Sequence, residues 1–110
     1  MVIGDILFKM RNLAIDSASQ MNLPTYYSDL YSINTTLDFD IVQYIKKLTK
    51  IIITHFPGID NNEAFSTALY AAYYELQKKD NQILKEHLAK IGSLNRFMSY
   101  YRSACKNPFA

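Results

Sequence analysis

Residues 37–56 read LDFDIVQYIKKLTKIIITHF, and this stretch decides the fold. Its apolar residues cover more than half of the circumference of a helix, which leaves a narrow strip for polar residues. The apolar positions are Leu37, Ile41, Val42, Tyr44, Ile45, Leu48, Ile51, Ile52, Ile53 and Phe56. The β-branched run near its end also suits a short strand, but strand alternation is missing, so a helix is favoured. We expect this helix to touch several neighbours at the centre of a bundle.

The flanking residues predict where this helix begins and ends. Thr35 or Thr36 is expected to cap its start, with Asp38 and Asp40 in the first turn, where carboxylates suit the positive end of the helix dipole. A proline and a glycine at positions 57 and 58 end it. The stretch 25–36 before it mixes tyrosines with polar residues and shows no period, so it is expected to be a connection that contains one turn of helix and is held by its tyrosines.

Four further segments have the one-sided apolar stripe of a helix packed on a core. The first covers about residues 3–21 and is closed by Pro24. The third follows Asp60, which together with Glu63 has the form of a capping box. The fourth starts at Asp80 or Asn81 and is expected to end in a left-handed cap at Gly92; the fifth follows from Ser93 and stops at Asn107-Pro108.

These segments predict an all-α fold, a compact bundle of four to five helices with a central hydrophobic helix near residues 37–56. The chain has 110 residues with only three glycines and three prolines, so we expect one helical domain over residues 1–110. Asp5 and Lys9 interrupt the apolar N-terminal stretch, which is unlike a signal peptide, and no apolar run is long enough to span a bilayer. The lone cysteine requires no oxidising compartment, so a cytoplasmic protein is expected.

No catalytic activity, metal site or cofactor is expected. Cys105 continues the apolar stripe of its helix, which favours an inert buried thiol. His55 lies near a helix end, where it suits the unpaired carbonyls, and His87 lies toward an inner face. The two acidic clusters, at 38–40 and 60–63, both fall at predicted helix starts, where capping already explains them. No glycine-rich phosphate loop or zinc-helix motif is present.

Charge is divided unevenly along the chain. Residues 78–110 carry seven lysines and arginines against two carboxylates, a net charge of +5. Residues 1–77 carry five lysines and arginines against eight carboxylates, a net charge of −3. A basic surface raises the local concentration of anionic partners, which include acidic protein faces and phosphates.

Aromatic and cationic residues on the outer faces of the third and fifth helices are the candidate partner-binding residues. Tyrosine and arginine are enriched at protein-binding hot spots, because each buries a large area and still makes directed hydrogen bonds. We therefore predict a small non-catalytic helical protein, of the inhibitor, immunity or accessory-subunit type, that binds a protein with an acidic surface. The predicted contact residues are Arg96, Tyr100, Arg102, Lys106, Phe109, Tyr70 and Tyr74. The alternative for the tyrosine pair is burial between neighbouring helices.

Two alternatives use the same residues differently. Residues 82–103 resemble a helix–turn–helix, and phosphate contacts from the basic helix would make this a nucleic-acid-binding surface. In the usual helix–turn–helix pattern a small residue precedes the turn glycine by four positions, which lets the two helices cross closely. Here Ala89 precedes Gly92 by three positions, and the rest of the chain is acidic. Self-association through the tyrosine-bearing face of the third helix is the other alternative.

Overall fold

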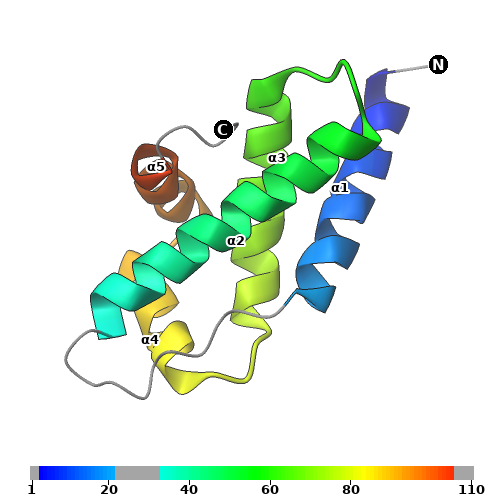
Figure 1. Ribbon diagram of the computed structural model, residues 1–110. Coiled ribbons are helices and arrows are strands. Elements are labelled where there is room, and N and C mark those ends of the chain that lie inside the picture. Colours follow the sequence, from blue (N-terminus) through cyan, green and yellow to red (C-terminus); the bar gives the residue numbers. More distant parts are fainter. Residues whose placement is uncertain (1–2, 22–32, 106–110) are drawn as a thin grey trace.

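The computed structural model describes residues 3–21 and 33–105, and over these residues it is an all-α bundle without strands (Figure 1). This confirms the predicted fold class. The five helices are α1 (Ile3–Gln20), α2 (Ile33–His55), α3 (Asn61–Gln77), α4 (Gln82–Ile91) and α5 (Leu94–Ala104). None of them is both long enough and apolar enough to cross a membrane.

Helix α3 runs through the middle of the molecule and contacts all four other helices. Helix α2 crosses it diagonally, with α1 on one side of α3 and the α4–α5 pair on the other (Figure 1). Lys79, just beyond α3, donates a 2.7 Å hydrogen bond to the carbonyl of Met21, so the end of α1 is held against the end of α3. The hydrophobic stretch from Leu37 to His55 is helical, as predicted, but the expected central position belongs to α3, which contacts all four other helices, and not to α2.

One cluster of buried apolar side chains joins the five helices. Alanines form much of the α1 and α3 contribution, and their small side chains let the two helix backbones approach closely. The buried apolar residues are Met10, Ala14, Ala18, Leu37, Ile41, Tyr44, Ile45, Leu48, Ile52, Ala64, Phe65, Ala68, Leu69, Ala71, Ala72, Leu76, Leu84, Leu88, Phe97, Tyr101 and Cys105. Every helix therefore depends on the same core.

The start of α2 corrects the sequence-based prediction. The helix begins at Ile33, so the predicted start at about residue 37 is one turn too late, and the last four residues of the stretch 25–36 belong to α2. Asp38 and Asp40 consequently lie in the second turn, away from the positive helix end. Their roles must come from tertiary contacts, because the dipole acts mainly within the first turn. Pro24 and residues 25–32 lie outside the described part of the chain.

The N-cap residues of α3, α4 and α5 were all predicted, and two of the three make the expected hydrogen bond. Asn81 accepts a 3.0 Å hydrogen bond from the backbone N–H of Leu84, and Ser93 accepts one of 3.2 Å from that of Arg96. Gly92 between α4 and α5 has a φ of 97°, the left-handed conformation that glycine adopts at no steric cost. Asp60 is the N-cap residue of α3, but its side chain makes no capping hydrogen bond, so the predicted capping box is wrong.

Candidate functional site

The exposed face of α5 is built as predicted, with its apolar side on the core. Phe97 and Tyr101 are fully buried, while Arg96, Ser99, Ser103 and Arg102 are exposed and Tyr100 is 47% exposed. With 3.6 residues per turn, Tyr100 and Arg102 fall at opposite edges of the exposed face, and Arg96, Ser99 and Ser103 fall between them. We call this surface, Arg96 to Ser103 without its buried members, the α5 face.

Each edge of the α5 face is tied to a neighbouring helix. The hydroxyl of Tyr100 donates a 2.7 Å hydrogen bond to Oδ2 of Asp38 on α2. At the other edge, the Arg102 guanidinium donates a 3.1 Å hydrogen bond to Oγ of Ser66 on α3 and lies 5.3 Å from the centroid of the Phe65 ring. Contacts within the bundle therefore orient the side chains of Tyr100 and Arg102, which border the face.

Asp38 is the centre of a polar network that the sequence did not predict. Its Oδ1 accepts a 2.7 Å hydrogen bond from the hydroxyl of Tyr101 and lies 3.1 Å from Nε2 of His87 on α4. That same nitrogen lies 2.9 Å from the Tyr101 oxygen. Together with the bond from Tyr100, this carboxylate joins α2, α4 and α5. We call these four residues the Asp38 network.

The proton positions in the Asp38 network follow from its donors. Each phenol has one proton, and both protons point to Asp38. Nε2 of His87 therefore has no proton to accept, so it must carry its own and donate it toward the Tyr101 oxygen and Oδ1 of Asp38. His87 is the half-buried histidine expected from the sequence, but its position between two polar partners was not anticipated.

Both tyrosines of the network are held in the neutral form. Burial, and then the hydrogen bond to Asp38, raise the pKa of Tyr101 far above its ordinary value. The hydrogen bond to Asp38, followed by burial, also raises the pKa of Tyr100. These hydroxyls are therefore hydrogen-bond donors at neutral pH, which suits them to orient side chains, and a phenolate nucleophile or metal ligand is disfavoured.

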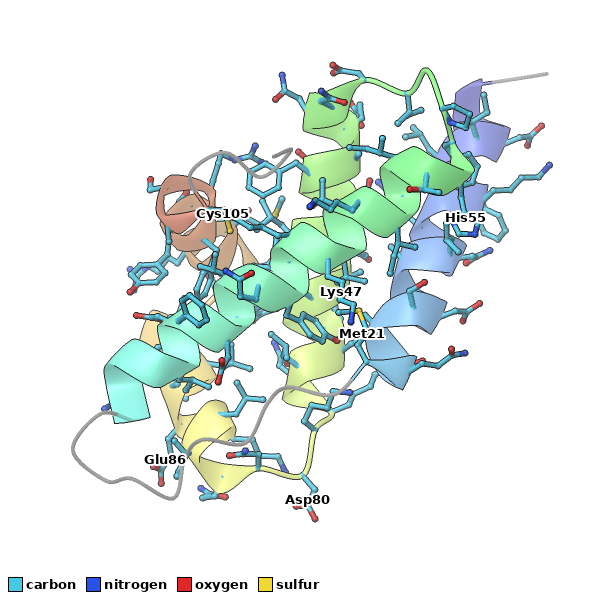
Figure 2. The ribbon with its side chains drawn as sticks, in the orientation of Figure 1. Met21, Lys47, His55, Asp80, Glu86 and Cys105 are labelled. Carbon is cyan, nitrogen blue, oxygen red and sulfur yellow. The ribbon has the colours of Figure 1, made fainter. Side chains whose placement is uncertain are left out.

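Cys105 directly follows α5, and its side chain is buried (Figure 2). Burial raises the pKa of the Cys105 thiol to about 11, although the nearby charge of Lys46 opposes this shift. Since the thiolate is the reactive form, the thiol is unreactive at neutral pH. The structure thus confirms that Cys105 belongs to the core.

The predicted tyrosine pair on α3 is separate from the α5 face. The rings of Tyr70 and Tyr74 lie 4.9 Å apart, and the guanidinium of Arg11 on α1 lies 5.6 Å from the Tyr70 centroid. Tyr74 is 42% exposed and Tyr70 is half-buried, so complete burial of the pair between helices is wrong. The remaining predicted contact residues, Lys106 and Phe109, lie outside the described part of the chain.

Two other features were missed in the sequence. Phe39, next to Asp38 on α2, is 61% exposed, although its helix is mostly apolar and buried. Asp40 is 2% exposed, its Oδ2 has no hydrogen-bond partner among the described residues, and burial raises its pKa. In the part of the chain that the structure describes, no cluster of three or more His, Cys, Asp or Glu residues is arranged to hold a metal ion.

Comparisons of the chain with protein-family models, with curated proteins and with solved structures find no match.

Proposed function

We propose that this protein acts by binding another protein, not by catalysis, and that the α5 face is its docking surface. The partner is a protein with an acidic surface, and the setting is the cytoplasm. The observation that carries the proposal is Tyr100, an aromatic side chain that is half-exposed and yet held in place by Asp38.

Preorganisation of the α5 face supports this proposal. Ordering a flexible side chain at an interface costs about 0.5–1.5 kcal/mol of binding free energy. The hydrogen bonds of Tyr100 to Asp38 and of Arg102 to Ser66 have already restricted these side chains in the free protein. A partner would therefore gain the area of the tyrosine ring and the planar guanidinium at a reduced entropic cost.

Charge supports an acidic partner. Residues 78–110 have a net charge of +5, and Arg96 is exposed without an ion pair or hydrogen bond from its guanidinium to another described residue. Complementary charge increases the rate of association and orients the encounter, whereas buried aromatic area supplies most of the affinity. We therefore expect Arg96 to increase the rate of association and Tyr100 to supply affinity.

The test is comparative affinity capture from the native host, followed by titration of the purified candidate. The variant Arg96→Glu reverses the free charge on the α5 face, and Lys47→Glu makes the same change on the exposed side of α2 (Figure 2). We expect Arg96→Glu to weaken binding of a true partner by about tenfold, which is 1.4 kcal/mol, while Lys47→Glu changes it little. Equal effects of the two variants, or none from either, would contradict docking at the α5 face.

Nucleic acid is the other outcome that this test must recognise. Fluorescence anisotropy with labelled single- and double-stranded DNA and RNA, at about 50 and 200 mM salt, detects phosphate contacts by a steep fall in affinity. If Arg96→Glu abolishes binding to nucleic acid, while the variant and the wild type capture the same proteins from the host, the surface binds nucleic acid. The protein-docking proposal is then rejected.

A further inference from the structure

A pocket lies at the other end of α2 from the Asp38 network. Ile6 and Lys9 of α1 form one wall, and residues 55–59, at the end of α2 and in the turn after it, form the other. The pocket has a volume of about 390 Å³. His55 lies seventeen positions after Asp38 in α2, about 26 Å along the helix axis, so the pocket is independent of the α5 face.

The turn that forms the pocket wall has a defined backbone. The N–H of Phe56 donates to the carbonyl of Ile52, and the N–H of Ile59 donates to the carbonyl of Phe56. Gly58 between them has a φ of 92°, which lets the chain reverse within two residues. The wall is therefore preformed, as is usual for small-molecule sites of about 300–1,000 Å³.

The lining combines an apolar floor with positive charge. Ile6, Phe56 and Ile59 are half-buried apolar side chains, and Lys9 and His55 carry the polar groups. No carboxylate is among the described lining residues. Within residues 3–21 and 33–105, Lys9 makes no ion pair, either with Asp5 one turn before it or with any other carboxylate.

His55 is one of the residues that line the pocket. Its Nδ1 lies 2.9 Å from the carbonyl of Ile51, as expected for a histidine at a helix end. This contact holds the ring, and Figure 2 shows His55 beside α1 where α2 ends. Because Nδ1 donates its proton to the carbonyl of Ile51, Nε2 of the neutral ring is an acceptor, and it makes no hydrogen bond to a described residue.

We propose that this pocket binds a free fatty acid, with the alkyl chain on Ile6, Phe56 and Ile59 and the carboxylate at Lys9. The apolar side chains of the lining make no directed contact, so they do not distinguish one alkyl chain from another. The Lys9 ammonium at the rim is complementary to a carboxylate and selects an anionic head.

The test is isothermal titration calorimetry of the full chain with sodium decanoate, and with 1-decanol as the uncharged molecule of the same chain length. We expect one decanoate per chain, with weaker binding of decanol. Lys9→Gln should weaken decanoate binding by about two- to fivefold and leave decanol binding unchanged, because one partly exposed ion pair is lost. Lys47→Gln is the matched control and should change neither.

A second variant tests the cavity itself. Ile6→Trp should fill the pocket and weaken both ligands by at least about tenfold. Thermal unfolding checks that the variant is folded, and Ile59→Trp replaces it if it is not.

Four results would overturn the proposal: no decanoate binding by the wild type, equal affinity for decanol, equal losses from Lys9→Gln and Lys47→Gln, or binding that survives in a folded tryptophan variant. Binding to anionic vesicles that decanoate does not displace would point to a membrane surface and would also reject it.

Discussion

At the scale of single residues, Asp38 has the largest expected effect on stability among the polar groups. Its carboxylate accepts from Tyr100 and Tyr101 and lies beside His87. In Asp38→Ala the buried hydroxyl of Tyr101 loses its acceptor, and leaving a buried donor unsatisfied costs about 1–3 kcal/mol. We expect the free energy of unfolding, measured by urea denaturation, to fall by that amount.

Asp16→Ala is the matched control for Asp38→Ala. Asp16 is also a helical aspartate, but it is exposed and its carboxylate makes no hydrogen bond to a described residue. Both changes remove one negative charge and gain the helix propensity of alanine, so their difference isolates the Asp38 network. A change within about 0.5 kcal/mol is expected for Asp16→Ala. If both variants lose the same stability, the network contributes nothing measurable.

The raised pKa of the buried Cys105 thiol predicts that the protein loses stability at alkaline pH. The folded thiol titrates at about pH 11, whereas the ordinary value is 9.0, so the unfolded chain loses this proton first as the pH rises. Unfolding therefore becomes more favourable between these two pH values, by at most about 3 kcal/mol for a two-unit shift. Tyr44 and Tyr101, whose pKa values burial also raises, add a decline that begins nearer pH 10.

The variant Cys105→Ala separates these contributions. Thermal unfolding at several pH values from neutral to 11 should show a shallower decline for the variant above pH 9, where the thiol of the wild type titrates in the unfolded chain. Identical pH profiles for the two proteins would show that the folded thiol titrates normally and that Cys105 is accessible to solvent.

At the scale of helices, the N-caps predict an order of stability effects. Ser93 and Asn81 each accept a hydrogen bond from the first turn of their helix, and alanine at such a site costs about 0.5–2 kcal/mol. Asp60 makes no capping hydrogen bond, so only its charge at the helix start is lost in Asp60→Ala, about 0.3–1 kcal/mol. Urea denaturation should give a smaller loss for Asp60→Ala than for the other two. The reverse order would mean that Asp60 caps α3 in solution.

Helix positions were predictable from the sequence because each depends on a local pattern. Apolar spacing identified all five helices, and Asn81, Gly92 and Ser93 identified three of their ends. The start of α2 was missed because Ile33 to Thr36 has low intrinsic helix propensity, and such a weak preference is overridden when a long helix packs on a core. Local pattern does not show how far tertiary packing extends a helix.

The Asp38 network could not be predicted by the same means, because it joins residues that are far apart in the chain. Asp38 lies 62 and 63 positions from its two tyrosine partners. One signal was present: Asp38, His87 and Tyr101 each sit next to or within the apolar stripe of a different helix. Polar groups that are drawn toward a core must find partners, so their pairing could have been proposed, although not which residue meets which. The exposed arginines of the α5 face, in contrast, followed directly from helical spacing.

At the scale of the whole molecule, the shared core predicts that the described helices unfold together. Leu84 of α4 and Phe97 of α5 lie in the same buried cluster as Leu69 of α3, so α4 and α5 have no separate core to retain structure. The single substitutions Leu84→Ala and Leu69→Ala should each leave one calorimetric transition, with equal calorimetric and van't Hoff enthalpies, and lower its midpoint. Both leucines are fully buried, and each loss should cost about 2–5 kcal/mol. A second, earlier transition that appears only in Leu84→Ala would show that α4 and α5 unfold independently, and the proposed docking surface on α5 would then be separable from the rest of the bundle.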